Sequence, residues 1–166
     1  MGPFIEVLDW NSEEETINWY INDQSWGFDQ SYVQYMVETV DRLDNIIDLD
    51  FNLVSDWRFS DIDVNLYNYV GQDYQGQAYL DYDASSEWTV LDVVDYSSLG
   101  ESENGNKNTF IHEFGHALGL AEPGFDNRWD QDDTAMSYNE GDIGWQTWYT
   151  QSDLNALKSV WGAEDD

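Results

Sequence analysis

Residues 109–118 read TFIHEFGHAL, and this stretch contains both histidines of the 166-residue chain. On a helix, the spacing of His112 and His116 places both imidazoles on one face, one turn apart, where both can bind a single metal ion. Glu113 comes one residue further round the helix, beside such an ion, where a carboxylate can take a proton from water. The alternative is a chance pair of surface histidines, but the flanking apolar residues predict a buried helix, in which two imidazoles need a partner. The stretch therefore predicts a metal-binding helix.

The apolar residues around the two histidines follow a helical period. Phe110, Phe114 and Leu118 fall on one face of the predicted helix, and Gly119 can end it. The polar stretch 100–106 predicts a loop before the helix begins.

Periodic patterns predict the other elements. The predicted strands are residues 16–21, 62–67, 78–82 and 88–94. Gly27 and Asp29 interrupt the apolar pattern after the first strand. Apolar residues at steps of three and four then predict a helix over 31–47. Residues 152–160 predict a closing helix that Gly162 ends. Strands in the middle of the chain with helices on either side predict a layered α+β or α/β domain.

The composition limits the class of protein. The chain carries 35 acidic and 5 basic side chains, a formal net charge of −30, so we expect no nucleic-acid and no membrane partner. No apolar run approaches the roughly 20 residues that a bilayer span needs. Cysteine is absent, which excludes disulfides and cysteine-based zinc sites. The charge fits either a salty or calcium-rich setting or simply a solubilising surface.

Two separated motifs resemble those of one enzyme family. Residues 112–124, HEFGHALGLAEPG, resemble the extended zinc signature of the metzincin metalloproteases, and residues 134–138, TAMSY, resemble their Met-turn. The Met-Ser-Tyr form, the Leu-Ala-x-Pro-Gly context and the closing helix over 151–162 look most like the catalytic domain of the serralysins. The resemblance implies an α+β fold with a twisted, mostly parallel sheet, an antiparallel edge strand, an active-site helix, a Met-turn and a C-terminal helix.

The resemblance also implies a domain organisation. Residues 1–166 form a single zinc-metalloprotease catalytic domain, with an upper sheet and helix subdomain over about 1–121. A lower subdomain over about 122–166 carries the Met-turn and the C-terminal helix. We expect no calcium β-roll domain in this chain, because it has no glycine- and aspartate-rich nonapeptide repeats.

Taken position by position, the resemblance assigns roles around the metal. His112 and His116 are zinc ligands, and Glu113 is the general base. Met136 forms a hydrophobic floor beneath the site, and Tyr138 approaches the zinc and stabilises the oxyanion of the transition state. Without the family spacing, Met136 would be an ordinary core methionine and Tyr138 a packed aromatic residue.

One position departs from the family pattern. The third zinc ligand of the family is a histidine ten residues after the first, and this chain has Glu122 there. Two histidines and one carboxylate form a catalytic zinc site in other enzymes, so Glu122 is our candidate for the third ligand. Two alternatives stay open: the site is weakened or inactive, or Asp126 or another nearby acid replaces Glu122.

The resemblance further implies a polypeptide substrate that lies antiparallel to an edge strand. The candidate strand contains Ala78, Tyr79 and Leu80, which would pair with the substrate by strand addition. The alternative is a plain sheet edge.

The leading hypothesis is a secreted, monomeric zinc endopeptidase. Residues 1–10 contain no signal-peptide pattern, so secretion is implied by the resemblance alone. One alternative is a catalytically weak or inactive protein that binds metal or peptide, and a second is a metal-dependent hydrolase of a non-peptide amide. Acidic residues concentrate between the second histidine and the Met-turn: Glu122, Asp126, Asp130, Asp132 and Asp133. We expect them to disfavour acidic substrates, and Ca²⁺ is a further candidate cofactor that would order this loop.

Overall fold

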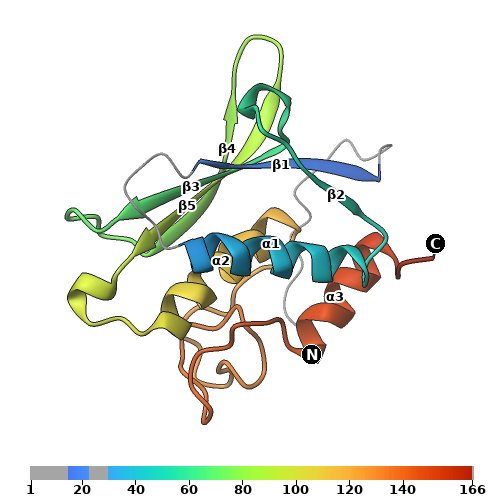
Figure 1. Ribbon diagram of the computed structural model, residues 1–166. Coiled ribbons are helices and arrows are strands. Elements are labelled where there is room, and N and C mark those ends of the chain that lie inside the picture. Colours follow the sequence, from blue (N-terminus) through green and yellow to red (C-terminus); the bar gives the residue numbers. More distant parts are fainter. Residues whose placement is uncertain (1–14, 23–29, 166) are drawn as a thin grey trace.

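The computed structural model describes residues 15–22 and 30–165 (Figure 1). In chain order the elements are β1 (Thr16–Asn22), α1 (Gln30–Asp44), β2 (Asp50–Leu53), the 3₁₀ turn η1 (Trp57–Phe59), β3 (Ile62–Asn68), β4 (Gly76–Tyr82), β5 (Glu87–Asp95), the 3₁₀ turn η2 (Ser97–Leu99), α2 (Glu103–Ala117) and α3 (Gln151–Trp161). The predicted break at Gly27 and Asp29 lies outside the described residues.

The five strands form one mixed sheet in the order β2-β1-β3-β5-β4. The pairs β1–β2, β1–β3 and β3–β5 are parallel, whereas β4 runs antiparallel to β5. β4 therefore lies at an edge of the sheet. This confirms the predicted fold class, a mostly parallel sheet with an antiparallel edge strand.

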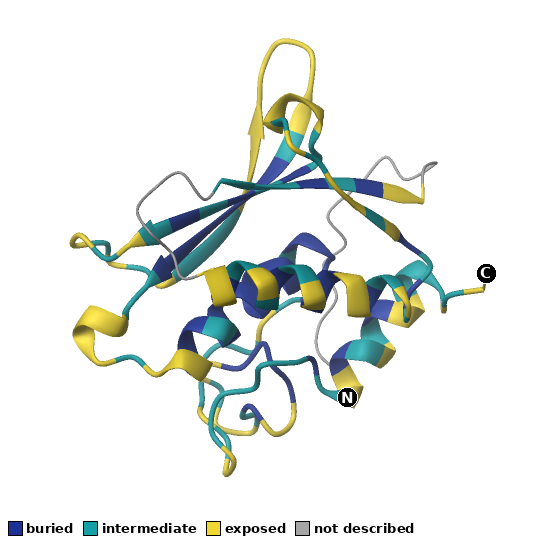
Figure 2. Ribbon diagram, viewed as in Figure 1, coloured by how far each residue is buried: buried dark blue, intermediate teal, exposed yellow. Residues whose placement is uncertain are grey.

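The core lies between the sheet and the two longer helices. Alternation along β3 turns Ile62, Val64 and Leu66 toward α1 and α2, and all three side chains are fully buried. Figure 2 shows the buried residues of the strands and helices gathered in this interior layer. Trp19 of β1 meets Phe114 of α2 edge to face at 6.1 Å, so the metal-motif helix packs directly on the sheet.

The strands and helices differ from the predicted ones mainly at their ends. The four predicted strands are confirmed within two residues at each end, whereas β2 was missed because it is only four residues long and largely exposed. The predicted loop over 100–106 is wrong from Glu103 onward. Ser102 caps α2 by accepting a hydrogen bond from the Gly105 N–H (3.0 Å), so polar residues form the first turn of this helix.

The C-terminal helix is confirmed, and it ends at Gly162, as predicted. Leu157 is its fully buried apolar residue, and Trp161 donates from Nε1 to the Leu118 carbonyl (2.9 Å), which ties α3 to the end of α2. Within the described part of the chain, no helix is both long and apolar enough to cross a bilayer.

Candidate metal centre

Both histidines of the motif lie near the C-terminal end of α2. Their Nε2 atoms face each other at 3.1 Å, and His112 is buried. The rings are nearly perpendicular, with their centroids 4.7 Å apart, as the i, i+4 spacing predicts for two imidazoles that point at one place.

Glu122 returns to this place after a tight turn. Leu120 N–H donates to the Gly115 carbonyl (2.8 Å), and Gly119 adopts a φ of +97°, a left-handed conformation that favours glycine. The turn brings Glu122 Oε2 to 2.9 Å from His112 Nε2 and 3.3 Å from His116 Nε2. One ligand atom from each of the three residues lies within 4.8 Å of the other two.

The chemistry of these donors fits a metal ion. The Leu120 carbonyl can only accept, so the contact at 2.8 Å requires a proton on His116 Nδ1 and leaves a lone pair on Nε2 of the neutral ring. Two imidazole nitrogens and a carboxylate oxygen converge here, and together they could bind a divalent cation. In residues 15–22 and 30–165 this is the one such group of three or more histidine, aspartate or glutamate side chains.

Asp126 does not belong to this group. Its carboxylate accepts from Arg128 Nε (3.0 Å, to Oδ1) and from the terminal guanidinium nitrogen (2.5 Å, to Oδ2). These hydrogen bonds lower the pKa of Asp126 to about 2. The geometry therefore favours Glu122 over Asp126 as the third ligand.

Glu113 lies on α2 beside the metal group and faces β4. A Cβ atom added to Gly76 would lie 2.6 Å from Glu113 Oε1, so only glycine allows the carboxylate to approach the strand this closely. Burial raises the pKa of Glu113 to about 7; the nearby His112 opposes this increase, and the negative charges of Glu122 and Asp92 add to it.

Tyr138 covers the other side of the group. Its ring stacks on His112 with 5.3 Å between the centroids and 27° between the planes. The side chain also hydrogen-bonds to Glu122. The bonds from His112 and Tyr138 lower the pKa of Glu122 to about 2, whereas burial and the bond to Glu122 raise the pKa of Tyr138. Burial and His112 lower the pKa of His116.

Met136 lies directly beneath the turn of α2 that carries the histidines. It is fully buried, and a Cβ atom added to Gly115 would lie 2.8 Å from its sulfur. The Met136 side chain therefore packs against the turn of α2 that carries the two histidines, and its role as a floor stays a prediction.

The predicted substrate strand is β4, at the sheet edge. Ala78 packs against the core, whereas Tyr79 and Leu80 are exposed. The structure places this strand beside Glu113 through the close approach at Gly76.

Sequence patterns did not indicate three residues that shape the site. Gln131 donates from Nε2 to the carbonyls of Ala135 (3.1 Å) and Ser137 (2.5 Å), on both sides of Met136. Asp153 accepts from Ala135 N–H, and Phe125 lies against Tyr138. These contacts join residues far apart in the sequence, so no local pattern indicates them. The one available signal was Asp153, an acid at the third position of α3, which is typical of a helix cap.

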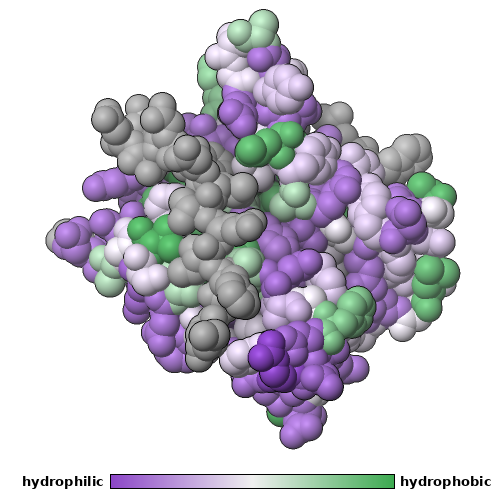
Figure 3. All heavy atoms as spheres, turned by 180° about the vertical axis from the view of Figure 1, so that it is seen from behind, coloured by the Kyte–Doolittle hydropathy of each residue, from purple (hydrophilic) through white to green (hydrophobic). Residues whose placement is uncertain are grey.

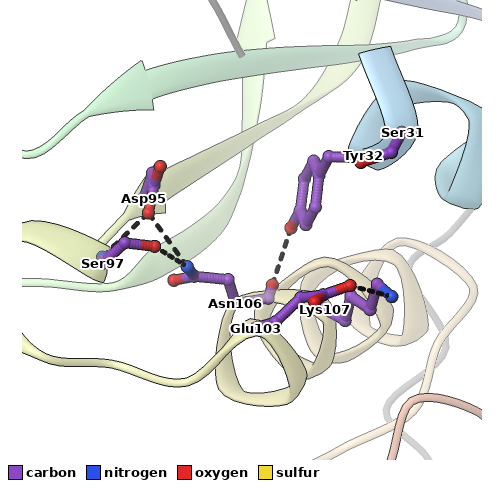
Figure 4. A pocket seen from close by; sticks show the side chains of 7 residues that line it. All are labelled: Ser31, Tyr32, Asp95, Ser97, Glu103, Asn106 and Lys107. Carbon is purple, nitrogen blue, oxygen red and sulfur yellow. Dashed lines mark hydrogen bonds and ion pairs between the residues drawn. The ribbon is translucent and has the colours of Figure 1, made fainter. Parts of the chain in front are cut away.

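A separate cavity of about 230 Å³ lies at the opposite, N-terminal end of α2 (Figure 4). Its lining residues are Ser31, Tyr32, Asp95, Ser97, Glu103, Asn106 and Lys107. The Asn106 amide donates to Asp95 (2.9 Å) and Ser97 (2.8 Å), and Lys107 pairs with Glu103 (2.6 Å), so the polar groups are bonded to one another. This cavity contains none of the grouped metal-ligand residues.

No protein-family model and no curated protein sequence matches the chain. The fold is similar to the solved structure of myroilysin, with a TM-score of 0.54 and 16% identity over 88% of this chain and 92% of that one. At this identity the likeness concerns the fold alone, and that fold agrees with the predicted α+β architecture of a mostly parallel sheet with an antiparallel edge strand. The nearer likeness to serralysins stays a prediction.

Proposed function

We propose that this protein is a zinc-dependent endopeptidase in which His112, His116 and Glu122 hold the metal and Glu113 is the general base. The observation that carries the proposal is the convergence of three ligand atoms within 4.8 Å next to a buried carboxylate on the same helix. The similarity of the fold to that of myroilysin supports a peptidase in particular.

When bound, zinc supplies Lewis acidity toward a carbonyl oxygen and toward water. The chain supplies the proton transfer: Glu113 takes a proton from the attacking water and returns it to the leaving amine. The Tyr138 hydroxyl, which bonds to Glu122 in the structure, can turn to donate a hydrogen bond to the oxyanion. Among residues 15–22 and 30–165 no strand pairs with the outer edge of β4, and an extended peptide can add there as a further strand, beside Glu113.

Glu122 changes the electrostatics of this site relative to three histidines. A carboxylate ligand lowers the net charge of the centre and makes the metal a weaker Lewis acid. We therefore expect the enzyme to depend strongly on Glu113 as the base. We also propose that the protein is secreted, acts as a monomer, and is divided near residue 121 into an upper and a lower subdomain.

The test combines bound-metal analysis with hydrolysis of an unfolded protein substrate, with and without a chelator. We expect about one equivalent of zinc and proteolysis that the chelator abolishes and added zinc restores. Glu113→Gln should keep the zinc and lose the proteolysis, since the carboxylate transfers protons and does not hold the metal. Bound zinc without cleavage of any peptide would contradict the proposal.

One observation favours a second candidate, a metal-binding or peptide-binding protein without peptidase activity. The Glu122 carboxylate, which is bonded to both His112 and Tyr138, would make the metal a weaker Lewis acid than a third histidine would. Such a protein would bind zinc and an extended peptide at β4, and it would leave that peptide intact over days of incubation.

A further inference from the structure

Phe125 is exposed next to the metal group, although it is a large apolar residue. The residue is 78% exposed, and its ring meets that of Tyr138 edge to face with 5.0 Å between the centroids. Tyr138 is itself 39% exposed, so both residues are partly open to solvent. We call these two rings the aromatic shelf.

The backbone holds the aromatic shelf in place. Gly124 pairs with Ser137 in a parallel bridge, and Tyr138 N–H donates to the Gly124 carbonyl (3.1 Å). Asp126 N–H donates to the Pro123 carbonyl (3.3 Å), which closes a turn with Phe125 near its tip. The backbone segments that carry the two rings are therefore held together, and little backbone entropy is lost when a ligand covers the rings.

The aromatic shelf adjoins the reacting centre. Tyr138 stacks on His112 at 5.3 Å and bonds to Glu122, so a side chain that rests on the shelf belongs to a residue within one or two positions of the bond at the metal group. The charges nearby act against acidic side chains. Residues 122–138 contain five acids and a single base, Arg128, and that base is paired with Asp126.

We propose that the aromatic shelf makes Phe125 a specificity-determining residue, which selects peptides with an aromatic or large apolar side chain beside the scissile bond. This inference rests on the proposed function, because it names the substrate class of the same site. Stacking on exposed rings favours aromatic and large apolar side chains over small ones, and the surrounding acids repel carboxylates.

The experiment uses three decapeptides that differ at one position beside the cleaved bond, which carries Phe, Ala or Glu. The cleaved bond is first located by mass spectrometry of a digested unfolded protein. We expect kcat/KM to be at least about tenfold higher for the Phe peptide than for the Ala peptide, and lowest for the Glu peptide. Phe125→Ala should reduce the Phe-to-Ala ratio to about twofold or less. An unchanged ratio would overturn the proposal, and so would an equal loss of kcat for all three peptides, which would show that Phe125 only positions Tyr138.

Phe59→Ala is the matched control, since Phe59 is 67% exposed on η1, outside the metal group, and should leave the ratio unchanged. A second arm measures binding of fluorescent Phe and Ala peptides to zinc-loaded Glu113→Gln. If the unaltered protein cleaves nothing but this variant binds the Phe peptide in a Phe125-dependent way, the proposed peptidase fails and the aromatic shelf stands. If the unaltered protein cleaves the peptides but neither kcat/KM nor binding favours the Phe peptide, the proposed peptidase stands and the aromatic shelf is refuted.

Discussion

Single side chains set the chemistry of the metal group, and Glu122 matters most among them. It is the one member that α2 does not carry, and it approaches both histidines with a single oxygen atom. His116, by contrast, is held in its tautomer by the Leu120 carbonyl. The affinity for zinc should therefore respond most clearly to changes at position 122.

Replacement of Glu122 by alanine should weaken zinc binding by more than about 100-fold, because loss of an outer-shell partner alone costs about 10–100-fold. Glu122→His should bind zinc, since imidazole is an equally suitable ligand. Zinc affinity is measured by competition with a chelating dye. Asp126→Ala is the control, as Asp126 is paired with Arg128, and equal affinities in all the variants would refute the role of Glu122.

Asp63 provides a pH-dependent prediction away from the metal group. Burial raises the pKa of this carboxyl, and repulsion from Asp81 adds to the increase, while a hydrogen bond from Ser60 opposes it. A raised pKa in the folded state means that protonated Asp63 stabilises the fold at low pH, and this stabilisation is lost as the pH rises through the folded-state pKa. Asp63→Asn should thus raise the free energy of unfolding at pH 7 and have little effect near pH 3, as measured by urea denaturation.

Asp83 is a control, because its pKa is shifted in the opposite direction from that of Asp63. The backbone N–H groups of Ser85 and Ser86 lower its pKa, so ionised Asp83 stabilises the fold above its unfolded-state pKa, and this stabilisation is lost as the pH falls through the folded-state pKa. Asp83→Asn should lower stability at pH 7 and not at low pH. The same pH profile for both variants would contradict this assignment of charges.

At the level of helices and strands, α2 connects the sheet to the lower loops. Its N-terminal end meets α1, where Tyr32 donates to the Asn106 carbonyl (2.6 Å). In its central part, the Ile111 carbonyl accepts a hydrogen bond from the Tyr149 hydroxyl (2.7 Å). The metal motif is therefore held by contacts from segments on both sides of it in the sequence.

Gly76 controls the distance between β4 and α2. In Gly76→Ala the new Cβ atom would lie within 2.8 Å of Thr109 Cγ2 and closer still to the Glu113 carboxylate, so β4 or Glu113 must move. We expect kcat for a peptide to fall at least about tenfold while zinc is retained, because a displacement of about 1 Å costs up to 100-fold. Gln75→Ala, at an exposed neighbouring position, should have no such effect, and full activity of Gly76→Ala would show that this approach is unimportant.

Asp153 fastens the Met-turn to α3. Its buried carboxylate accepts from Thr134 Oγ1 (2.5 Å), Ala135 N–H (2.9 Å) and Thr150 N–H (2.9 Å). Asp153→Ala should lower the free energy of unfolding by about 3 kcal/mol, since it leaves buried donors without an acceptor. Denaturant titration measures this, and Asn155→Ala on the exposed face of α3 should stay within about 0.5 kcal/mol of the unaltered protein. Equal effects of the two substitutions would count against this role.

Across the whole molecule, charge is the dominant property. The net charge is −30, and hydrophilic side chains cover most of the coloured surface in Figure 3, with small, separate hydrophobic patches between them. Four of the five basic side chains have a local partner: Arg58 with Asp56, Lys107 with Glu103, Arg128 with Asp126, and Arg42 over the ring of Trp148 (3.9 Å). Repulsion among the acids therefore acts against the compact state.

Salt should stabilise the protein substantially. Raising NaCl from 0.01 to 1 M shortens the screening length from about 30 to about 3 Å, so we expect Tm to rise by several degrees in a thermal melt. Calcium at matched ionic strength separates screening from specific binding to the acidic loop. An additional rise with millimolar calcium would support a calcium role there, whereas a Tm that does not depend on salt would contradict the repulsion.

The sequence alone determined the parts of the molecule that depend on local geometry. The i, i+4 spacing of His112 and His116 gives one helical face regardless of what packs around it. Alternation predicted two of the strands, and short apolar segments predicted two more. The start of α2 was misplaced because a cap at Ser102 overrides the polarity of the residues that follow.

Tertiary structure decided what depends on residues far apart in the chain. The convergence of Glu122, the stacking of Tyr138 on His112, the approach of Gly76 to Glu113 and the aromatic shelf all join separate segments. Family resemblance indicated some of these residues, but neither period nor composition could place them. The physical reason is that a local pattern records which face of an element is buried, whereas contacts between segments depend on how turns and packed layers bring those faces together.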